Sequence, residues 1–240
     1  MSPHTTTPKR IHIRVAILAG VPALSIALGA TYAGQADAAS TRADRTVPSE
    51  GLGYVYADNG DGTYTTGTAI VLTSTGKVIT NDHVIAAARS IEVTDAADQV
   101  RYPATVISAD ATDDVAELQL AGASDLVTAS IADSAPFRGE PVVAAGNADS
   151  LFRFPVPQAA GVVTATGATE RITVPAGTEI LTGMILSDAK TAAGDSGGPL
   201  FNEYGQVIGM DTAVAEPNSR TPHYVTMSVP ILTALAEASE

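Results

Sequence analysis

A serine in the second half of the chain lies in a setting that favours nucleophilic chemistry. Ser196 belongs to the run Gly-Asp-Ser-Gly-Gly-Pro-Leu at residues 194–200. Its glycines allow a tight turn whose backbone N–H groups can point at a ligand. A serine on such a turn can attack a carbonyl, while nearby N–H groups, here those of Gly194 and Ser196, hold the oxygen that becomes negative. The run therefore predicts a nucleophile and an oxyanion hole.

A serine hydroxyl is a poor nucleophile at neutral pH and needs a neighbouring base, most often histidine. Two of the four histidines lie in an N-terminal leader described below. Of the other two, His83 follows predicted strands at residues 68–72 and 77–80, joined by a turn, so that a short loop can present it to a cleft. His223 by itself is more typical of a partly buried strand histidine. His83 is therefore the candidate base.

The third group needed is a buried carboxylate that holds the histidine in one tautomer and stabilises its charged form. The segment at residues 109–121 supplies candidates, because Val115, Leu118 and Leu120 would anchor it in a core. Asp114 directly precedes this strand and is the preferred carboxylate. Asp113 and Asp110 stay open as alternatives.

These stretches resemble chymotrypsin-fold (trypsin-like) serine peptidases, most closely the protease domain of bacterial HtrA-type enzymes. The resemblance rests on Thr-Asn-x-His-Val at residues 80–84, on Asp-x-Ala-x-Leu at residues 114–118 and on the Gly-Asp-Ser-Gly-Gly run, in the order His, Asp, Ser. It implies that His83, Asp114 and Ser196 form a catalytic triad.

The resemblance extends over residues 50–232, through segments at residues 142–147, 161–167 and 201–214. The chain departs from it at Asp195, where HtrA-type enzymes usually carry asparagine, so a need for N-terminal processing stays open. A PDZ domain, which full-length HtrA proteins carry, is not expected to follow.

Strand-like runs separated by Gly, Asn and Asp turns indicate an all-β fold. The resemblance implies two packed six-stranded Greek-key β-barrels, which would make residues 51–240 one trypsin-like serine peptidase domain. A short C-terminal helix is predicted at residues 231–238 from its apolar face. The run Asp-Asn-Gly-Asp-Gly at residues 58–62 predicts a hairpin turn, since the ligand positions of a calcium loop do not fit.

The first 38 residues have the composition of a secretory signal peptide. A basic start precedes a largely apolar stretch at residues 15–33, and Ala-Asp-Ala at residues 36–38 offers a cleavage site. Residues 39–50 are polar and indicate a disordered tether or a short pro-segment. The prediction is a secreted, extracellular protein with no stable membrane contact after cleavage; an uncleaved membrane anchor is the alternative.

Charge and composition narrow the possible partners. The net charge of −13 opposes binding to nucleic acid. The chain has no cysteine, so stability must come from the core and from hydrogen bonds, and neither a metal nor a cofactor is expected. Protein or peptide substrates are the predicted partners, and the oligomeric state stays open.

The residue preference before the cut bond is harder to predict. Lys190, six residues before Ser196, could attract an acidic side chain with help from His223. The alternative places Lys190 in solvent beside a pocket for small aliphatic side chains, as in HtrA-type relatives. Two other functions on the same fold also stay open, a non-catalytic binding protein and a chaperone-like peptide-binding protein.

Overall fold

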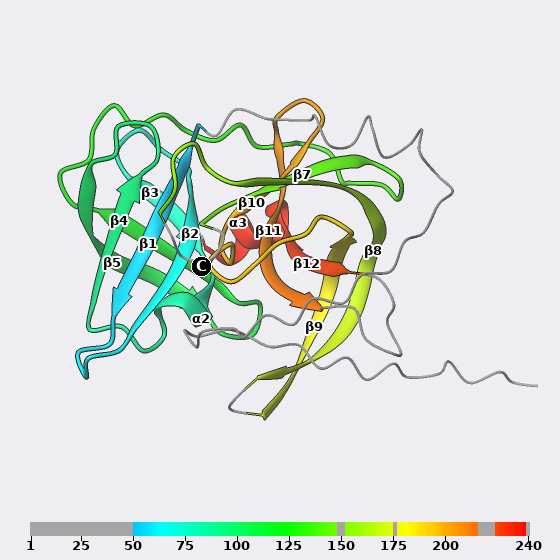
Figure 1. Cartoon of the computed structure of the whole chain (residues 1–240), viewed down its shortest axis with the longest axis horizontal. Helices are drawn as coiled ribbons and strands as arrows, with labels where there is room; N and C mark the ends of the chain where they lie inside the picture. The colour runs from blue at the N-terminus through cyan, green and yellow to red at the C-terminus, as the bar shows by residue number, and fades with distance from the viewer. Residues whose placement is uncertain (1–49, 148–151, 175–176, 216–223, 239–240) are drawn as a thin grey trace, which may run out of the picture.

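The part of the chain that the computed structural model describes consists of four ranges, residues 50–147, 152–174, 177–215 and 224–238. The predicted leader at residues 1–38, all but the last residue of the predicted tether at residues 39–50, and His223 lie outside these ranges. The described ranges form two closed six-stranded β-barrels that lie side by side, as the two groups of arrows in Figure 1 show. This confirms the predicted all-β architecture.

The first barrel has the strand order β1-β2-β3-β6-β5-β4, and its neighbouring strands are antiparallel. A one-turn helix, α2 (Asp82–Ile85), lies between β3 and β4. The strands are β1 (Leu52–Asp58), β2 (Tyr64–Val71), β3 (Lys77–Thr80), β4 (Ser90–Asp95), β5 (Arg101–Asp110) and β6 (Val115–Leu120).

The second barrel has the strand order β10-β11-β12-β9-β8-β7, also antiparallel, and a C-terminal helix, α3 (Ile231–Glu237), follows its last strand. The strands are β7 (Pro141–Ala145), β8 (Gln158–Val174), β9 (Gly177–Ser187), β10 (Pro199–Asn202), β11 (Val207–Ala215) and β12 (Val225–Pro230). Together with the first barrel, these elements confirm the predicted chymotrypsin-like fold.

Strands of the first barrel carry apolar side chains on both faces, because one face fills the barrel and the other meets the second barrel. Successive side chains of a strand point to opposite faces. On β1, Val55 belongs to the interior cluster, whereas Tyr54 belongs to a cluster shared with Phe201 and Met210 of the second barrel. On β2, Ala69 and Ile70 divide in the same way. This shared core fixes the two barrels against each other and so positions loops from both.

The predicted local elements are mostly found, with two differences that packing explains. His83 was expected on a short loop, but it lies on α2, where Val84 and Ile85 are buried and anchor the turn. The strand expected at residues 161–167 is part of the much longer β8, which extends with β9 beyond the barrel as a hairpin at the bottom of Figure 1. Residues 59–62 form the predicted turn between β1 and β2.

Candidate active site

Ser196 lies on a tight loop that leads into β10. Gly194 and Gly197 have φ angles of +97° and +84°, which side chains other than glycine rarely adopt. A Cβ on Gly197 would lie 2.1 Å from the carbonyl oxygen of Thr68, so the loop can approach β2 only because this residue is glycine. The Gly197 N–H donates to the carbonyl of Asp211 at 2.8 Å, which ties the loop to β11. The loop conformation therefore depends on both barrels.

Thr68 of β2 holds this loop across the barrel interface. Its hydroxyl donates to the Gly194 carbonyl at 2.8 Å and accepts the Asn147 N–H at 2.9 Å. Its backbone N–H donates to the Ser196 carbonyl at 2.8 Å, and its own carbonyl accepts the Thr80 hydroxyl at 2.7 Å. Thr68 is fully buried, so water does not compete for these bonds. Two of these bonds hold the loop that carries the serine, and the other two fix Thr68 itself against Asn147 and against Thr80 of β3.

His83 is oriented by Asp114 through two separate contacts. The imidazole Nδ1 lies 2.8 Å from Asp114 Oδ2, and the backbone N–H of His83 donates to Asp114 Oδ1 at 2.9 Å. The hydroxyl of Thr212 on β11 also donates to Asp114 Oδ2. Asn81 donates from Nδ2 to the Asp114 carbonyl at 2.9 Å, which holds the backbone of this residue. The carboxylate therefore accepts from both barrels and fixes the ring of His83.

The structure distinguishes the three aspartates that the sequence offered. Asp110 accepts the N–H groups of Thr112 and Asp113, so its carboxylate caps the turn before β6. Asp113 is half-buried. Asp114 is buried and adopts a φ of +56°, which residues other than glycine rarely have. Of the three, Asp114 is the one that contacts His83.

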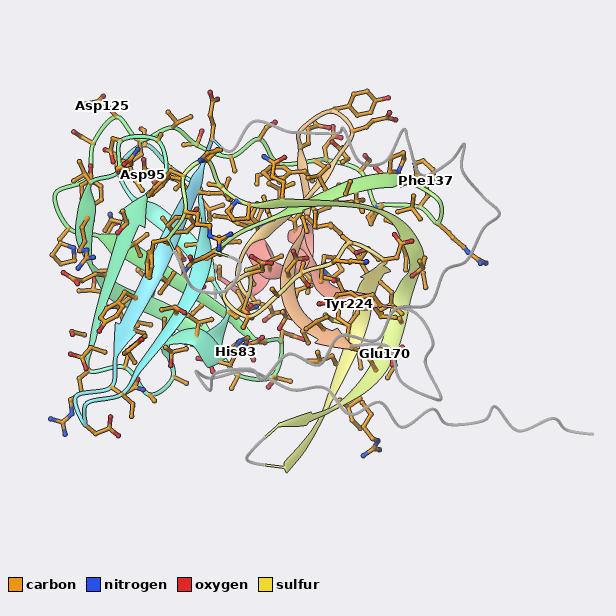
Figure 2. All side chains as sticks on the ribbon, viewed as in Figure 1. His83, Asp95, Asp125, Phe137, Glu170 and Tyr224 are labelled. Atoms are coloured by element: carbon orange, nitrogen blue, oxygen red, sulfur yellow. The ribbon has the colours of Figure 1, made fainter. Side chains whose placement is uncertain are left out.

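A pocket lies where the two barrels meet, and His83 and Ser196 both line it. One wall is the segment at residues 191–196, which includes the N–H groups predicted for the oxyanion hole at Gly194 and Ser196. The segment at residues 211–214 of β11 forms another part of the lining. Figure 2 shows the ring of His83 at the edge of the first barrel that faces the second. The pocket brings the imidazole of His83, the hydroxyl of Ser196 and a glycine-rich loop to one place.

The structure describes one of the two residues considered for the specificity pocket. The side chain of Lys190 is exposed, and Lys190 is not among the described residues that line the pocket. His223 lies outside the described residues. The position of Lys190 fits the alternative in which this lysine points to solvent.

Three residues of the site were not singled out from the sequence. Thr68 lies on β2, and Asp211 and Thr212 lie on β11. Their roles arise from contacts over long separations, such as the 98 residues between Thr212 and Asp114. A polar residue inside an otherwise apolar run, such as Asp211 after Gly-Met, was the available hint.

Asp211 is an acidic side chain buried at the pocket wall. It is 2% exposed, and burial, followed by the nearby negative charge of Asp195, raises the pKa of its carboxyl to about 8. The Ser228 hydroxyl donates to Asp211 Oδ1 at 2.6 Å and partly opposes this rise. At neutral pH the folded protein therefore holds a proton here that the unfolded chain has lost.

This raised pKa predicts that stability falls as pH rises. Below about pH 4 the Asp211 carboxyl is protonated in both the folded and the unfolded chain, and the folded chain keeps this proton up to about pH 8. Between these two pH values, each unit of rising pH therefore lowers the free energy of unfolding by up to ~1.4 kcal/mol. Asp211→Asn carries no titrating group, so its melting temperature should fall less between pH 5 and pH 8 than that of the wild type. Thermal unfolding across this range checks the result, with the exposed Asp133→Asn as control. Parallel curves for wild type and Asp211→Asn would contradict the raised pKa.

The fold and the site define a class of protein. Two antiparallel barrels, with a serine on a glycine-rich loop and a histidine–aspartate pair in the pocket between them, are typical of chymotrypsin-like peptidases. Residues 67–210 match the family model of the trypsin-like peptidase domain. The chain belongs to this family.

Curated relatives of the chain are serine proteases by name. The chain is 36% identical over 149 residues to the periplasmic pH-dependent serine endoprotease DegQ of Escherichia coli, a match that covers 62% of this chain and 31% of DegQ. It is 35% identical over 150 residues to a probable serine protease do-like of Buchnera aphidicola, covering 62% of this chain and 30% of that protein. The chain thus matches about three tenths of the length of these relatives.

The solved structures share the fold. A serine endoprotease from Yersinia pestis matches with a TM-score of 0.63 at 24% identity, covering 86% of this chain and 66% of the other. The HtrA-type protease AlgW, solved with a tripeptide, matches with a TM-score of 0.66 at 24% identity, covering 78% of this chain and 58% of the other. Among the described residues, no helix is long and apolar enough to cross a membrane.

Proposed function

We propose that this chain is a serine endopeptidase that hydrolyses peptide bonds through Ser196, His83 and Asp114. The observation that carries the proposal is the 2.8 Å contact between His83 Nδ1 and Asp114 Oδ2, in a pocket that His83 and Ser196 line together. Membership of the trypsin-like peptidase family and the serine protease names of the relatives support it.

The cycle follows from the roles of these groups. With Nδ1–H donated to Asp114, the Nε2 atom of His83 is left as the base that removes the proton from the Ser196 hydroxyl. The serine oxygen attacks the peptide carbonyl, and the resulting imidazolium, facing the carboxylate, gives its proton to the leaving amine. Water then hydrolyses the acyl-enzyme by the same sequence of proton transfers.

An oxyanion forms in acylation and again in deacylation. The backbone N–H groups of Gly194 and Ser196 donate hydrogen bonds to it. Donors of this kind stabilise the transition state most when they are held rigidly before the substrate arrives. The bonds from Thr68 to the carbonyls of Gly194 and Ser196 support this role, because they hold the peptide groups on either side of the nucleophile.

We further propose that the protein is exported and that residues 1–38 form a leader cleaved after Ala38. The basic and apolar composition of these residues supports this, as does the periplasmic description of DegQ. Protein or peptide substrates follow from the proposed reaction, and residues 51–240 would form the peptidase domain. N-terminal sequencing of protein recovered from outside the cytoplasm should begin at Ala39, and an intact leader there would contradict cleavage.

The acyl-enzyme step is tested by pre-steady-state kinetics. A chromogenic p-nitrophenyl ester should release a burst of nitrophenol equal to the concentration of active protein, followed by a slower steady rate. A linear release with no burst under conditions where the ester is hydrolysed would argue against an accumulating covalent intermediate. A folded protein that hydrolyses neither ester nor peptide would favour the non-catalytic binding protein.

Substitution of Thr68 tests whether its hydroxyl holds the loop that carries Ser196. Thr68→Val keeps the shape of the side chain but removes the bond to the Gly194 carbonyl and the acceptor for the Asn147 N–H. We expect kcat to fall by about 100-fold, because small displacements of the groups around the nucleophile have effects of this size. KM should change much less, since the substrate does not contact this buried side chain.

The control for this variant is Thr68→Ser, which keeps the hydroxyl and loses only a methyl group. It should recover most of the wild-type kcat. Thermal unfolding should show Thr68→Val destabilised by about 1–3 kcal/mol, the usual cost of leaving a buried polar group unpaired. Equal kcat values for the Val and Ser variants would show that the hydroxyl has no part in positioning the loop.

A further inference from the structure

Two tyrosines on the outer face of the first barrel stack on each other. The rings of Tyr56 on β1 and Tyr64 on β2 have centroids 5.3 Å apart, and their planes differ by 25°. In the antiparallel pairing, Tyr56 lies opposite Thr66 and Tyr64 lies opposite Asp58, so the two rings are diagonal neighbours on one face. Tyr64 is 58% exposed although its ring packs on Tyr56. The tyrosine pair therefore presents an aromatic surface to solvent.

The same face of β2 leads from the tyrosine pair into the pocket. Side chains two residues apart share a face of a strand, so Tyr64, Thr66 and Thr68 follow one another on the side that meets the second barrel. Thr66 lines the pocket, and the backbone N–H of Thr68 donates to the Ser196 carbonyl. At about 3.3 Å per residue, Tyr64 lies about 13 Å along the strand from Thr68. An extended peptide that leaves the pocket along β2 meets the tyrosine pair after about two or three residues.

The part of a substrate that crosses β2 is the part after the cut bond. In the proposed reaction His83 gives a proton to the leaving nitrogen, which must therefore lie beside its ring. His83 lies on α2, and α2 packs on β2, since a Cβ on Gly67 would lie 2.7 Å from Val84 Cγ1. Among the described residues, the first barrel lines the pocket with His83, Thr65 and Thr66, whereas the loop with the predicted oxyanion donors belongs to the second barrel. The segment after the cut bond is thus directed over the first barrel, toward the tyrosine pair.

Hydrogen bonds fix the turn between β1 and β2, which lies at the lower left of Figure 1. The N–H of Gly60 donates to Asp58 Oδ1 at 2.7 Å. The N–H of Thr63 donates to Asp61 Oδ1 at 2.9 Å. The N–H of Arg89, directly before β4, donates to the Asp58 carbonyl at 2.7 Å. The strands that carry the tyrosine pair are therefore joined rigidly, and a preformed surface loses less conformational freedom on binding than a mobile one.

We propose that Tyr56 and Tyr64 form a specificity surface for an aromatic side chain at the second or third residue after the cut bond. This inference rests on the proposed peptidase function, because a reaction at Ser196 is what places the cut bond in the pocket. An aromatic ring can add to the tyrosine pair in an offset or edge-to-face arrangement, beyond the apolar area that it buries. The turn beside the pair carries aspartates and an arginine, so no single sign of charge competes with this contact.

The test uses the full chain and internally quenched peptides that differ only at these two positions. Their common sequence comes from a cleavage site that mass spectrometry maps in unfolded casein, so the residues before the cut bond stay constant. Phenylalanine, cyclohexylalanine and alanine are compared at each position. At one of the two, phenylalanine should give a kcat/KM about tenfold above alanine and about threefold above cyclohexylalanine, which has a similar size but no π system.

Variants of Tyr64 assign this preference to the tyrosine pair. Tyr64→Ala should bring the phenylalanine and alanine peptides to within about twofold of each other, whereas Tyr64→Phe keeps the ring and should retain the preference. Tyr204→Ala is the matched control, because it removes an exposed tyrosine between β10 and β11 that does not line the pocket, and it should also retain the preference. A p-nitrophenyl ester has no residue after the cut bond, so Tyr64→Ala should hydrolyse it at the wild-type rate. This separates lost recognition from damage to the triad.

Several results would overturn the inference. Equal kcat/KM for phenylalanine and alanine at both positions would do so, as would equal values for phenylalanine and cyclohexylalanine, or a phenylalanine preference that Tyr64→Ala retains. If thermal unfolding shows that Tyr64→Ala is not folded, the wild-type peptide series decides by itself. In all these cases the nitrophenyl ester burst on Ser196 still occurs in the wild type, so the proposed peptidase function survives. Absence of both the burst and all hydrolysis in folded protein would overturn the function and the inference together.

Discussion

Ser196→Ala should lower kcat by about a millionfold, the loss expected when the nucleophile of a triad is removed. The substitution deletes a single hydroxyl, and the loop is held by backbone contacts that do not involve it. The Ser196 carbonyl still accepts the Thr68 N–H, and the Gly197 N–H still donates to the Asp211 carbonyl. Hydrolysis of a peptide p-nitroanilide, measured with enough protein to detect the residual rate, checks the prediction.

Thermal unfolding serves as the control for this variant. The melting temperature of Ser196→Ala should stay within the small range typical of substitutions that break no buried contact. Hydrolysis near the wild-type rate by a folded Ser196→Ala protein would mean that another group performs the reaction. An unfolded variant would indicate instead that the hydroxyl has a structural partner.

Asp114→Asn should lower kcat by about 10⁴-fold, because it reverses the tautomer of His83. The His83 backbone N–H contacts Asp114 Oδ1 and requires an acceptor there, so the asparagine oxygen would take this position. Its NH₂ group would then lie where Oδ2 accepts His83 Nδ1, and would donate to that nitrogen. The proton would move to Nε2, which could no longer accept the proton of Ser196.

The neighbouring aspartate gives a matched control. Asp113→Asn removes the same charge one residue away, and its kcat should stay within about twofold of the wild type, as for most substitutions outside such contacts. The tautomer itself is visible by ¹⁵N NMR of the imidazole, which should show Nδ1–H in the wild type and Nε2–H in Asp114→Asn. If kcat fell strongly in Asp113→Asn and stayed unchanged in Asp114→Asn, Asp113 and not Asp114 would be the carboxylate of the triad.

The sequence predicted the parts of the site that local pattern determines. Ser196 and His83 lie in short runs whose glycines and turn residues mark the loop or turn that carries them. Asp114 could be preferred but not separated from Asp110, because the choice depends on which carboxylate contacts α2. The turn capped by Asp110 and the positive φ of Asp114 make that choice, and neither is visible as a pattern of residue types.

The rest of the site depends on how two barrels meet. Thr68 is separated from Gly194 by 126 residues, and their hydrogen bond requires the packing of Tyr54 and Ile70 against the second barrel. Lys190 was considered by counting back from Ser196, but the exposure of a side chain in a loop follows from its backbone angles and not from its spacing. Asp211 lies opposite Ser228 in the antiparallel pairing of β11 with β12 and accepts its hydroxyl, a contact that depends on the strand register.

Reaction of the folded protein with a small fluorophosphonate tests the central claim most directly, because such a probe bonds only to a serine that a neighbouring base has activated. Intact mass followed by peptide mapping should find one adduct per chain, on Ser196, with labelling lost on heat denaturation and strongly slowed in Asp114→Asn. No adduct on folded protein, or an adduct on a serine other than Ser196, would contradict the account.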